Sequence, residues 1–310
     1  MINGILNIYK EKGYTSHDVV ARLRRIVGQK KIGHTGTLDP DAEGVLPVCL
    51  GKVTKVCDML TDRDKTYETV LLLGKTTDTQ DISGTVLEER ETDGITPEMT
   101  EKCIQGFAGV YDQIPPMYSA LKVNGRKLYE LAREGRTVER KSRRVTIHRI
   151  QILDMELPRV KMEVDCSKGT YIRTLCQDIG DRLGTGGCME QLVRTRSGRF
   201  GIASAWRLDE VQELAAAGKL GDILIPLDSV FEDLPEAVVS SREAQRAFNG
   251  NAVSEKGVRM QKKPEPGERC RIYDPDGHFI GIYQYDADKM RFELEKMFLD
   301  PEEIVSGRGN

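Results

Sequence analysis

The sequence predicts a chain of mixed helices and strands, with one large domain followed by a small β-rich unit. A chain of 310 residues can bury a large core, and a large domain with a smaller one is the expected division at this length. Residues 160–166 alternate apolar with charged side chains, as a half-buried strand does, whereas residues 171–183 carry apolar side chains at helical spacing. From about residue 240, short β-like runs separated by turns replace these patterns.

The other elements are predicted from the same periodicities and from their turn and capping residues. Residues 1–9 are apolar and compatible with a strand, and Ser16 is a good N-cap for a helix at 16–28. The further predicted helices are 51–60, 96–105, 127–133, 208–217 and 241–248. The further predicted strands are 45–50, 69–73, 85–89, 145–153, 269–273, 279–285 and 290–294.

Composition indicates a soluble protein of the reducing cytoplasm. Charged residues make up 31% of the chain, and no apolar run approaches the roughly 18 residues of a membrane span. The N-terminus lacks a signal-peptide pattern. The seven cysteines are scattered without paired spacing and form no zinc pattern with the four histidines, which favours free thiols over disulfides or a metal site.

A basic segment between Lys122 and Arg149 is the main local feature of the charge distribution. The net charge of −3 argues against a uniformly basic nucleic-acid binder, but this segment holds ten Lys or Arg against three Glu. Such a patch is sufficient for phosphate binding, because the field that attracts RNA is local. The alternative is a solvated helix face followed by a loop.

The segment 33–47 is predicted to be a shaped loop that carries a carboxylate. Its three glycines permit backbone angles that are closed to other residues, and Pro40 pushes Asp39 toward an extended conformation. A rigid loop that presents Asp39 is a candidate active site. The alternative is an Asx-turn, in which Asp39 hydrogen-bonds its own backbone.

The amino-acid sequence of this loop closely resembles the catalytic motif of the TruB-type tRNA pseudouridine synthases. The matching positions are 33–40, Ala42, Gly44, Val45 and Leu46. The resemblance implies that Asp39 is the nucleophile and that His34 helps to displace the target base or fills its place. The turn 10–16 resembles the N-terminal signature of the family, with Glu11 where proline is usual, and this match puts Lys10 among the substrate-binding residues.

Tyr67 and Leu192 lie in two further matching segments. Lys65-Thr66-Tyr67, followed by a Gly-x-x-Thr-Asp-Thr turn, resembles the second family signature, in which the tyrosine stacks on the target base. The segment 192–198 resembles the last family element, whose leucine contacts the flipped base. The alternatives are an aromatic strand residue and an ordinary leucine, both in the hydrophobic core.

Tyr171 and Arg173 lie in the segment 166–173, which resembles the third family signature. There the arginine pairs with the catalytic aspartate, and the tyrosine lines the pocket. The position of Arg173 also suggests an anionic partner, with Asp39 as the candidate, because a cation at the positive end of a helix dipole gains nothing locally. The alternative is a surface arginine paired with Asp178 or with water.

An insertion at 113–144 resembles the thumb that closes on the RNA loop in this family. Two prolines exclude a helix near its start, and residues 136–144 are expected to be a basic, poorly structured arm. Without the resemblance, the insertion would be interpreted as a flexible surface excursion. The residues expected to bind the RNA backbone are Arg140, Lys141, Arg143 and Arg144.

The resemblance covers roughly residues 1–230 through several separate motifs in the family order. It implies an α+β pseudouridine-synthase fold, with a long mixed, mostly antiparallel sheet flanked by helices in a catalytic domain at 1–235. The unit at 240–310 resembles the PUA-like RNA-binding module of bacterial members. The implied reaction is isomerisation of uridine 55 in the tRNA T-loop, by a cytoplasmic monomer that needs no cofactor, metal, membrane or obligatory protein partner.

Two other functions remain open. One is that of the related guide-RNA-dependent synthase, which modifies ribosomal RNA within a ribonucleoprotein. The intact thumb-like insertion and the short C-terminal module favour the stand-alone enzyme over this one. The other is that of an RNA chaperone that folds tRNA without chemistry, and the set of Asp39, Tyr67 and Arg173 argues against binding alone.

Overall fold

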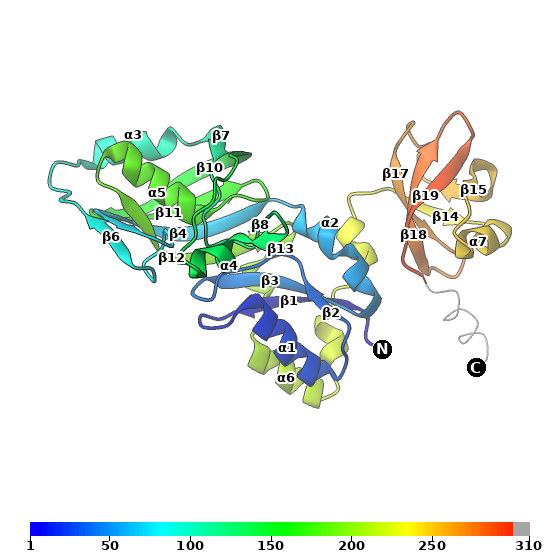
Figure 1. Cartoon of the computed structure of the whole chain (residues 1–310). Coiled ribbons are helices and arrows are strands. Elements are labelled where there is room, and N and C mark those ends of the chain that lie inside the picture. Colours follow the sequence, from blue (N-terminus) through cyan, green and yellow to red (C-terminus); the bar gives the residue numbers. More distant parts are fainter. Residues whose placement is uncertain (300–310) are drawn as a thin grey trace. The chain divides into compact units, whose positions relative to one another are not determined.

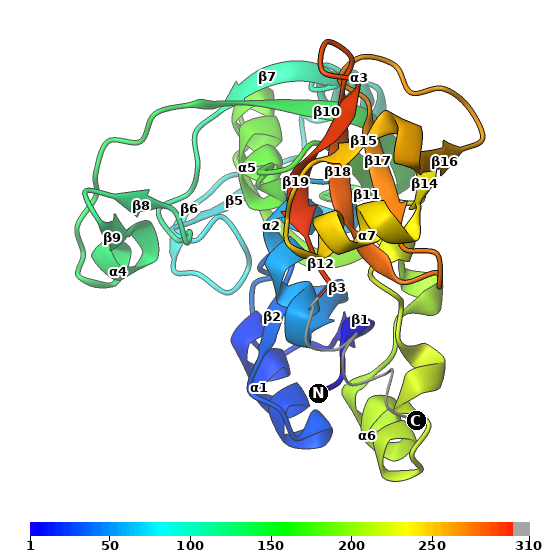
Figure 2. The same cartoon turned by 90° about the vertical axis from the view of Figure 1, so that its right-hand side faces the viewer.

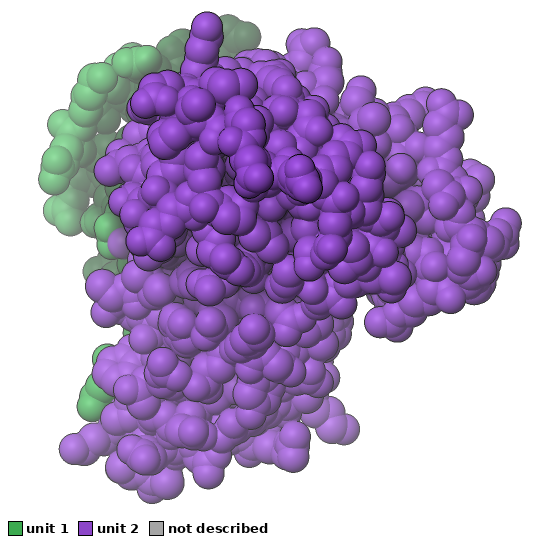
Figure 3. All heavy atoms as spheres, turned by 90° about the vertical axis from the view of Figure 1, so that its left-hand side faces the viewer, with its two compact units in different colours: residues 1–5, 49–55, 221–310 green, residues 6–48, 56–220 purple. Residues whose placement is uncertain are grey.

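The computed structural model describes residues 1–299, and these residues form two compact units (Figure 3). The large unit comprises residues 6–48 and 56–220. The small unit comprises residues 1–5, 49–55 and the described chain from residue 221 onward. Every helix within residues 1–299 is too short or too polar to pass through a lipid bilayer.

A mixed β-sheet is the main feature of the large unit (Figure 1). Its principal strands are β1 (Gly4–Lys10), β3 (Glu43–Leu50), β4 (Lys65–Leu73), β7 (Gly109–Gln113), β10 (Arg143–Glu156), β11 (Arg159–Cys166) and β12 (Gly187–Ser197). They run in the order β1-β3-β12-β4-β11-β10-β7. β3 and β12 are parallel, whereas β12, β4, β11, β10 and β7 pair antiparallel in turn. The predicted mixed, mostly antiparallel sheet is therefore confirmed.

Short strands add to this sheet and to the loops around it. β2 (Ile32–His34) pairs with β3, and β13 (Phe200–Gly201) pairs with β12. β5 (Lys75–Thr77) and β6 (Val86–Glu89) form a separate antiparallel pair. The turn between β5 and β6 contributes to the site described below.

Strand β11 illustrates how the sequence pattern becomes a covered sheet face. Val160, Met162 and Val164 are fully buried, whereas Lys161 between them is exposed. Helices α3 (Pro97–Gln105) and α5 (Ile172–Leu183) lie together over the sheet (Figure 1) and contribute to the same hydrophobic core. Burial of this face supplies the main driving force for holding helix and sheet together.

The helix predictions are confirmed with two corrections. The other α-helices are α1 (Ser16–Val27), α2 (Cys57–Thr61), α4 (Leu128–Arg133), α6 (Leu208–Ala216) and α7 (Ser241–Phe248). The predicted helix at 51–60 is a 3₁₀ helix, Gly51–Val56, followed by α2. The predicted N-cap Ser16 is wrong, because Thr15 caps α1: its side chain accepts from the Asp18 N–H and the Asp18 carboxylate accepts from the Thr15 N–H.

The remaining 3₁₀ helices are short connectors. They are Ile202–Ser204, Leu220–Ile223, Asp228–Phe231 and Glu255–Gly257. α1 and α6 pack side by side, as Figure 1 shows. Arg22 of α1 forms an ion pair with Asp209 of α6.

Strand β12 is the principal element that the sequence analysis missed. It pairs with β4 along its length, but the register shifts once between Met189 and Gln191 and again between Arg194 and Arg196. Each shift places two residues of β12 opposite one of β4, which interrupts the alternation of inward and outward side chains. A strand with two such bulges does not show the period-2 pattern on which the strand predictions depended.

The chain leaves the sheet after β7 and returns at β10 (Figure 2). Between them, β8 (Lys122–Val123) and β9 (Arg126–Lys127) form a hairpin, and α4 follows with Leu128 and Leu131 buried. The arm predicted as poorly structured to Arg144 is in part ordered, because β10 begins at Arg143 and pairs with β7.

The small unit is built on a second sheet, with the strand order β15-β19-β18-β17-β14-β16. The three strands predicted after residue 260 are confirmed as β17 (Arg269–Tyr273), β18 (Phe279–Asp286) and β19 (Arg291–Met297). The sequence analysis missed β14 (Glu236–Val239), β15 (Val253–Ser254) and β16 (Val258–Met260). α7 packs into the core of this sheet through Ala244, Ala247 and Phe248.

Candidate active site

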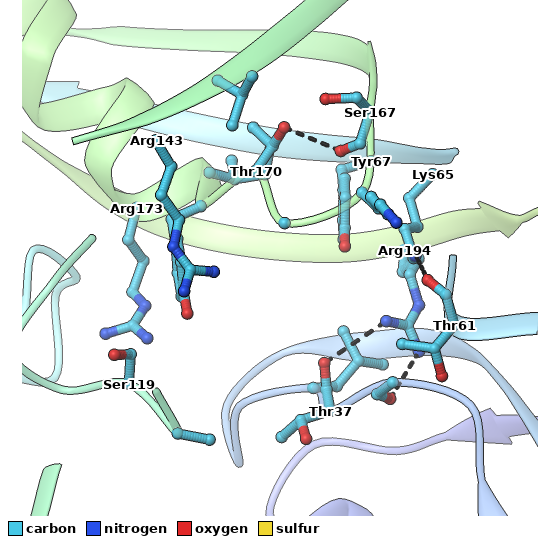
Figure 4. A pocket seen from close by; sticks show the side chains of 18 of the residues that line it. Thr37, Thr61, Lys65, Tyr67, Ser119, Arg143, Ser167, Thr170, Arg173 and Arg194 are labelled. Atoms are coloured by element: carbon cyan, nitrogen blue, oxygen red, sulfur yellow. Dashed lines mark hydrogen bonds between the residues drawn. The ribbon is translucent and has the colours of Figure 1, made fainter. Parts of the chain in front are cut away.

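A cavity of about 770 Å³ opens where the Asp39 loop, β4, β12, the start of β10 and the start of α5 meet. Its volume lies within the range of pockets that hold a small ligand. The described residues that line it include two acidic ones, Asp39 and Asp62. They include six basic ones, which are Lys65, Arg143, Arg144, Lys168, Arg173 and Arg194. In Figure 4, Arg143 and Arg173 lie together at one side of the cavity, with Lys65 and Arg194 at the other.

The Asp39 loop is held by the end of β1 and by the turn that follows it. The ammonium of Lys10 is fully buried and donates to the backbone carbonyls of Pro40 (3.1 Å) and Ala42 (2.6 Å). The Gly13 N–H donates to the same Pro40 carbonyl (2.9 Å). Burial lowers the pKa of Lys10 to about 8, although the nearby Asp39 carboxylate favours the charged form. By binding these two carbonyls, Lys10 fixes the backbone on either side of Asp41.

Ser16 holds the residue before Asp39. Its hydroxyl accepts a hydrogen bond from the Leu38 N–H (2.9 Å) and donates to the Leu38 carbonyl (3.3 Å). Because Thr15 caps α1, the Ser16 side chain is free to make this contact. The Thr-Ser pair of the N-terminal signature therefore has two tasks: one residue starts the helix, and the other anchors the loop.

Arg194 holds the loop from the side of the sheet. It is 1% exposed, and its Nε donates to the Val45 carbonyl (2.7 Å). Its terminal nitrogens lie 3.5 Å and 3.4 Å from the carbonyl oxygens of Thr37 and Gly36. Dashed lines mark hydrogen bonds of Arg194 in Figure 4. The backbone at Gly44 has φ +104°, and a Cβ there would lie 2.2 Å from the Arg194 carbonyl oxygen, so only glycine fits.

Asp39 and Arg173 form the ion pair that the sequence predicts. Arg173 Nε lies 3.0 Å from Asp39 Oδ2, and Arg173 Nη2 lies 3.4 Å from Asp39 Oδ1. This is a two-point contact of the kind that guanidinium groups make with carboxylates. The side chain of Arg173 is only 6% exposed, whereas that of Asp39 is 40% exposed, toward the cavity that it lines. Arg173 makes no ion pair with Asp178 in residues 1–299.

The electrostatic setting of Asp39 is a balance between burial and its cationic partner. Burial in the walls of the cavity raises the pKa of the Asp39 carboxyl, the Arg173 guanidinium opposes that rise, and the Asp81 carboxylate adds to it. Arg173 thus favours the ionised form of Asp39. Asp41, two residues further along, is exposed and is absent from the described lining of the cavity.

Arg173 is itself fixed by two other segments of the chain. Its Nη1 donates to the Thr79 carbonyl (3.0 Å), in the turn after β5, and its Nη2 donates to the Tyr118 carbonyl (2.8 Å), in the insertion. The Asp81 carboxylate lies 3.9 Å from its Nε. The guanidinium therefore links α5 to the Asp39 loop, to the turn after β5 and to the insertion.

Tyr67 and Leu192 form an apolar part of the cavity wall. Each is 8% exposed, each belongs to the core of the large unit, and each lines the cavity. The core position and the pocket position that the sequence offered as alternatives are thus compatible. Burial raises the pKa of the Tyr67 hydroxyl, and the positive charge of Arg194 opposes this rise.

The other residues predicted for substrate binding divide into two groups. Tyr171 lines the cavity at the start of α5. Lys10 and His34 are not among the described residues that line it. His34 ends β2, packs edge-on against His17 with ring centroids 5.5 Å apart, and accepts from the Gly36 N–H. Burial lowers its pKa, so the neutral imidazole prevails at neutral pH.

The four residues predicted to bind the RNA backbone also divide. Arg143 and Arg144 line the cavity and have exposed side chains. Lys141 is exposed but is not part of the described lining. Arg140 donates to the Pro115 carbonyl (3.1 Å) across the base of the insertion, a contact that holds the insertion together.

One cluster among the described residues has the composition of a metal site, and it lies in the small unit. It consists of Asp274, Asp276 and His278. The Asp274 carboxylate already accepts from the backbone N–H groups of Asp276 and His278 and contacts the His278 ring. The hydrogen bonds of a turn therefore account for its position.

The functional contacts that the sequence analysis missed are those of Ser16 and Arg194 with the loop backbone, and of Arg173 with the Thr79 and Tyr118 carbonyls. A signal for Arg194 was present: it lies two residues from Leu192, so both side chains are on one face of an extended segment. An arginine on the face that carries a core leucine needs buried acceptors. The backbone carbonyls that supply them are not visible in a sequence.

Comparisons with known proteins identify relatives along the length of this chain. Residues 24–172 match the TruB family pseudouridylate synthase N-terminal domain, and residues 173–232 match the tRNA pseudouridylate synthase B C-terminal domain. The chain is 51% identical to tRNA pseudouridine synthase B of Lachnoclostridium phytofermentans, over 96% of this chain and 100% of that protein. It is 38% identical to tRNA pseudouridine synthase B of Bacillus pumilus, over 99% of this chain and 98% of that protein.

Solved structures share the fold. The crystal structure of a Cbf5-Nop10-Gar1 complex contains a chain with a TM-score of 0.73 and 25% identity, covering 96% of this chain and 86% of that one. The structure of an H/ACA RNP bound to a substrate RNA containing 2′-deoxyuridine gives a TM-score of 0.72 at 24% identity, over 96% of this chain and 86% of that one. The predicted α+β pseudouridine-synthase fold is confirmed. Identity of 38% and 51% over almost the full length of the two tRNA pseudouridine synthase B relatives shows that the chain belongs to the TruB family of pseudouridylate synthases, which are isomerases.

Proposed function

We propose that this protein converts uridine 55 in the T-loop of tRNA to pseudouridine, with Asp39 as the nucleophile. The observation that carries the proposal is the two-point ion pair of Asp39 with buried Arg173, in a cavity whose described lining has six basic and two acidic residues. The names of the relatives, tRNA pseudouridine synthase B, support tRNA as the substrate.

The reaction requires one ionised nucleophile and a closed space. The C1′–N1 bond breaks, the uracil turns, a C1′–C5 bond forms, the C5 proton leaves and N1 gains a proton. The change is redox-neutral and transfers nothing to a second molecule. Asp39 attacks as the carboxylate, which Arg173 keeps charged and oriented against the effect of burial.

The target nucleotide must leave its stack to reach Asp39. Tyr67 and Leu192 offer an aromatic face and an apolar contact in the cavity wall, which compensate for the stacking that the base loses. Tyr171 lies on the side of Arg173, at the start of α5. The cavity volume of about 770 Å³ accommodates one nucleotide with its ribose.

Charge and position support an RNA-binding role for the insertion at 113–144. Its last residues, Arg143 and Arg144, are exposed at the cavity, where RNA phosphates would flank an inserted nucleotide. We assign chemistry to residues 1–235 and RNA affinity and orientation to the unit from residue 240. The last part of that unit, residues 300–310, lies outside the described residues.

A guide-RNA-dependent activity is the second candidate, because the Cbf5 complex shares the fold. The 25% identity to that chain is well below the 38–51% identity to the tRNA pseudouridine synthase B relatives. This difference favours a stand-alone enzyme that acts on tRNA. One assay, described next, tests both candidates.

The test is tritium release from a tRNA transcript labelled at C5 of uridine, with the purified protein alone. Release from the normal transcript, and its loss when position 55 carries cytidine, is the expected result. A transcript that releases no tritium without a guide RNA and further proteins would overturn the stand-alone assignment. Release that persists with cytidine at position 55 would overturn the choice of nucleotide.

A further inference from the structure

Helix α5 begins without a side-chain cap of its own, although the start of this helix places both Tyr171 and Arg173 at the cavity. The N-cap residue is Tyr171, with φ −97° and ψ 108°, and its side chain makes no capping hydrogen bond within the described structure. A tyrosine cannot accept from the N–H groups of the first turn as Ser, Thr, Asp or Asn do. The position of this helix start must therefore be fixed by other groups.

Gln113 supplies the missing anchor from 58 residues away in the sequence. Its side-chain Oε1 accepts from the Tyr171 N–H (2.8 Å), and its Nε2 donates to the Tyr171 carbonyl (3.0 Å). The amide thus binds both backbone groups of one residue, as a neighbouring strand would. Gln113 is 1% exposed, and its Nε2 also donates to the Tyr111 hydroxyl, so the side chain is held in this orientation.

The place of Gln113 in the fold links this anchor to the insertion. Gln113 is the last residue of β7, opposite Arg143, the first residue of β10. The chain leaves the sheet for the insertion directly after Gln113 and returns at Arg143. A few residues into the insertion, the Tyr118 carbonyl accepts from Arg173 Nη2 (2.8 Å).

Rotation or displacement of the helix start would move the two cavity residues together. Tyr171 is the residue that Gln113 binds, and Arg173 follows it by two positions in the first turn of α5. The two-point contact of Arg173 with Asp39 tolerates little displacement, because both of its N–O distances are already 3.0 Å and 3.4 Å. Misplacement of a reacting group by about 1 Å can cost about 100-fold in rate.

We propose that Gln113 is a positioning residue for the isomerisation: by binding the backbone of Tyr171, it sets the orientation in which Arg173 meets Asp39. The proposal rests on the roles assigned to Asp39 and Arg173 under the proposed function. Gln113 does not line the described cavity and is given no contact with the substrate.

The test compares Gln113→Met with a matched control, Gln105→Met. Methionine keeps the length of the side chain and removes both polar contacts. Gln105 ends α3, is exposed, and donates one hydrogen bond to the Ile150 carbonyl (3.3 Å), so the same substitution there removes a backbone contact away from the start of α5. The neighbouring Gly106 carbonyl accepts from Arg182, in the last turn of α5. Single-turnover pseudouridine formation at saturating enzyme, filter binding of tRNA and thermal melting are measured for both variants.

A positioning role predicts a loss of about 10- to 100-fold in the single-turnover rate constant of Gln113→Met, with tRNA affinity within about threefold of the parent. Gln105→Met should match the parent in both. A variant with a lower melting temperature but the parental rate constant would assign Gln113 a structural role only and overturn the proposal. If Gln113→Met does not fold, Gln113→Glu replaces it. This variant keeps the acceptor for the Tyr171 N–H and loses the donor to the Tyr171 carbonyl. A smaller loss in the single-turnover rate constant is then expected, and a parental rate constant again contradicts the proposal.

A double-variant comparison separates action through Arg173 from general loosening. If Gln113 acts by orienting Arg173, adding Gln113→Met to Arg173→Lys should slow the enzyme little further, because the contact it sets is already impaired. Full additivity of the two rate losses would contradict this route. Asp39→Asn in the same assay tests the underlying assignment: an inactive Asp39→Asn with a parental Gln113→Met removes the positioning role alone, whereas an active Asp39→Asn removes the proposed function itself.

Discussion

The two sides of the cavity are held in different ways. The loop that carries Asp39 is anchored by Lys10, Ser16 and Arg194, which bind its backbone from the end of β1, the start of α1 and strand β12. The start of α5, which carries Arg173, is anchored by Gln113 and the Tyr118 carbonyl, both at the base of the insertion between β7 and β10, and by the Thr79 carbonyl in the turn after β5.

This difference separates a fixed side from a dependent side. The anchors of the Asp39 loop come from β1, α1 and β12. Two of the three anchors on the Arg173 side belong to the insertion that we propose binds the RNA, and the third is the Thr79 carbonyl. Arg173 opposes the rise that burial causes in the pKa of Asp39, and the Tyr118 carbonyl of the insertion accepts from Arg173. Substitutions on the two sides should therefore have different signatures.

The largest effect is expected from Asp39→Asn. The amide nearly preserves the shape of the side chain and removes the nucleophile, so turnover should fall by about 10,000-fold or more. Filter binding should show tRNA affinity close to that of the parent, because the backbone anchors of the loop do not involve the carboxylate. Loss of binding together with activity would indicate that the substitution disturbs the loop, and a thermal melt separates that outcome from unfolding.

Arg173→Lys tests the dependent side. Lysine retains the charge but cannot reproduce the planar two-point contact, and a loss of about 10- to 100-fold in rate is expected. The pH dependence should change as well. Burial raises the pKa of Asp39 and Arg173 opposes the rise, so weakening this contact raises that pKa further. The acidic limb of the rate profile should then move to higher pH. An unchanged limb would mean that Arg173 does not set the ionisation of Asp39.

Lys10→Met tests the fixed side. The substitution leaves the buried Pro40 and Ala42 carbonyls without the ammonium, at a cost of about 1–3 kcal/mol in the free energy of unfolding. The native pKa of about 8 is below the ordinary value of 10.5, so between these values the unfolded chain binds a proton that the native protein does not, and the parent gains stability as pH rises. Urea unfolding should show the gap between parent and variant widening from pH 8 to pH 10. A constant gap would contradict a native pKa of Lys10 below that of the unfolded chain.

The basic side chains at the end of the insertion should affect binding more than chemistry. Neutralising Lys141, Arg143 and Arg144 to glutamine should weaken tRNA binding and flatten the dependence of log K on log salt by about 0.7 for each lost phosphate contact with single-stranded RNA. The matched control neutralises three cations of β10 and β11 that pair with glutamates, Arg149, Arg159 and Lys161. An equal change in both triple variants would reduce the effect to net charge.

The sequence predicted those parts of the fold in which one periodicity runs without interruption. β11 and α5 were found because each buries one face at a constant spacing. β12 was missed because two bulges break its alternation, although it lies at the centre of the sheet. Ser16 was assigned to the wrong task because a Thr-Ser pair offers two possible caps, and the choice depends on Leu38, which lies 22 residues away.

The predicted part of the site includes the charged pair as well as Tyr67, Tyr171, Leu192, Arg143 and Arg144, which line the cavity. A cation at the positive end of a helix needs an anion, and that argument with the family resemblance led from Arg173 to Asp39. Gln113 and Arg194 could not be found in this way, because their partners are backbone atoms that every residue has. Only the folded chain shows which N–H and carbonyl groups lack partners and which side chains reach them.

The smallest effect is expected from Asp41→Asn, and the comparison of this variant with Asp39→Asn is the most direct test of the account. Asp41 lies in the same loop, on the other side of the Pro40 carbonyl that Lys10 binds, but it is exposed and away from the described lining of the cavity. The measurement is the ratio of single-turnover rate constants for pseudouridine formation, with both variants folded and saturated with tRNA. The account predicts an Asp41→Asn rate within about threefold of the parent and a ratio of about 10,000 or more between the two variants. A ratio near one would show that the two carboxylates are equivalent, and Asp39 would then be a turn residue rather than the nucleophile.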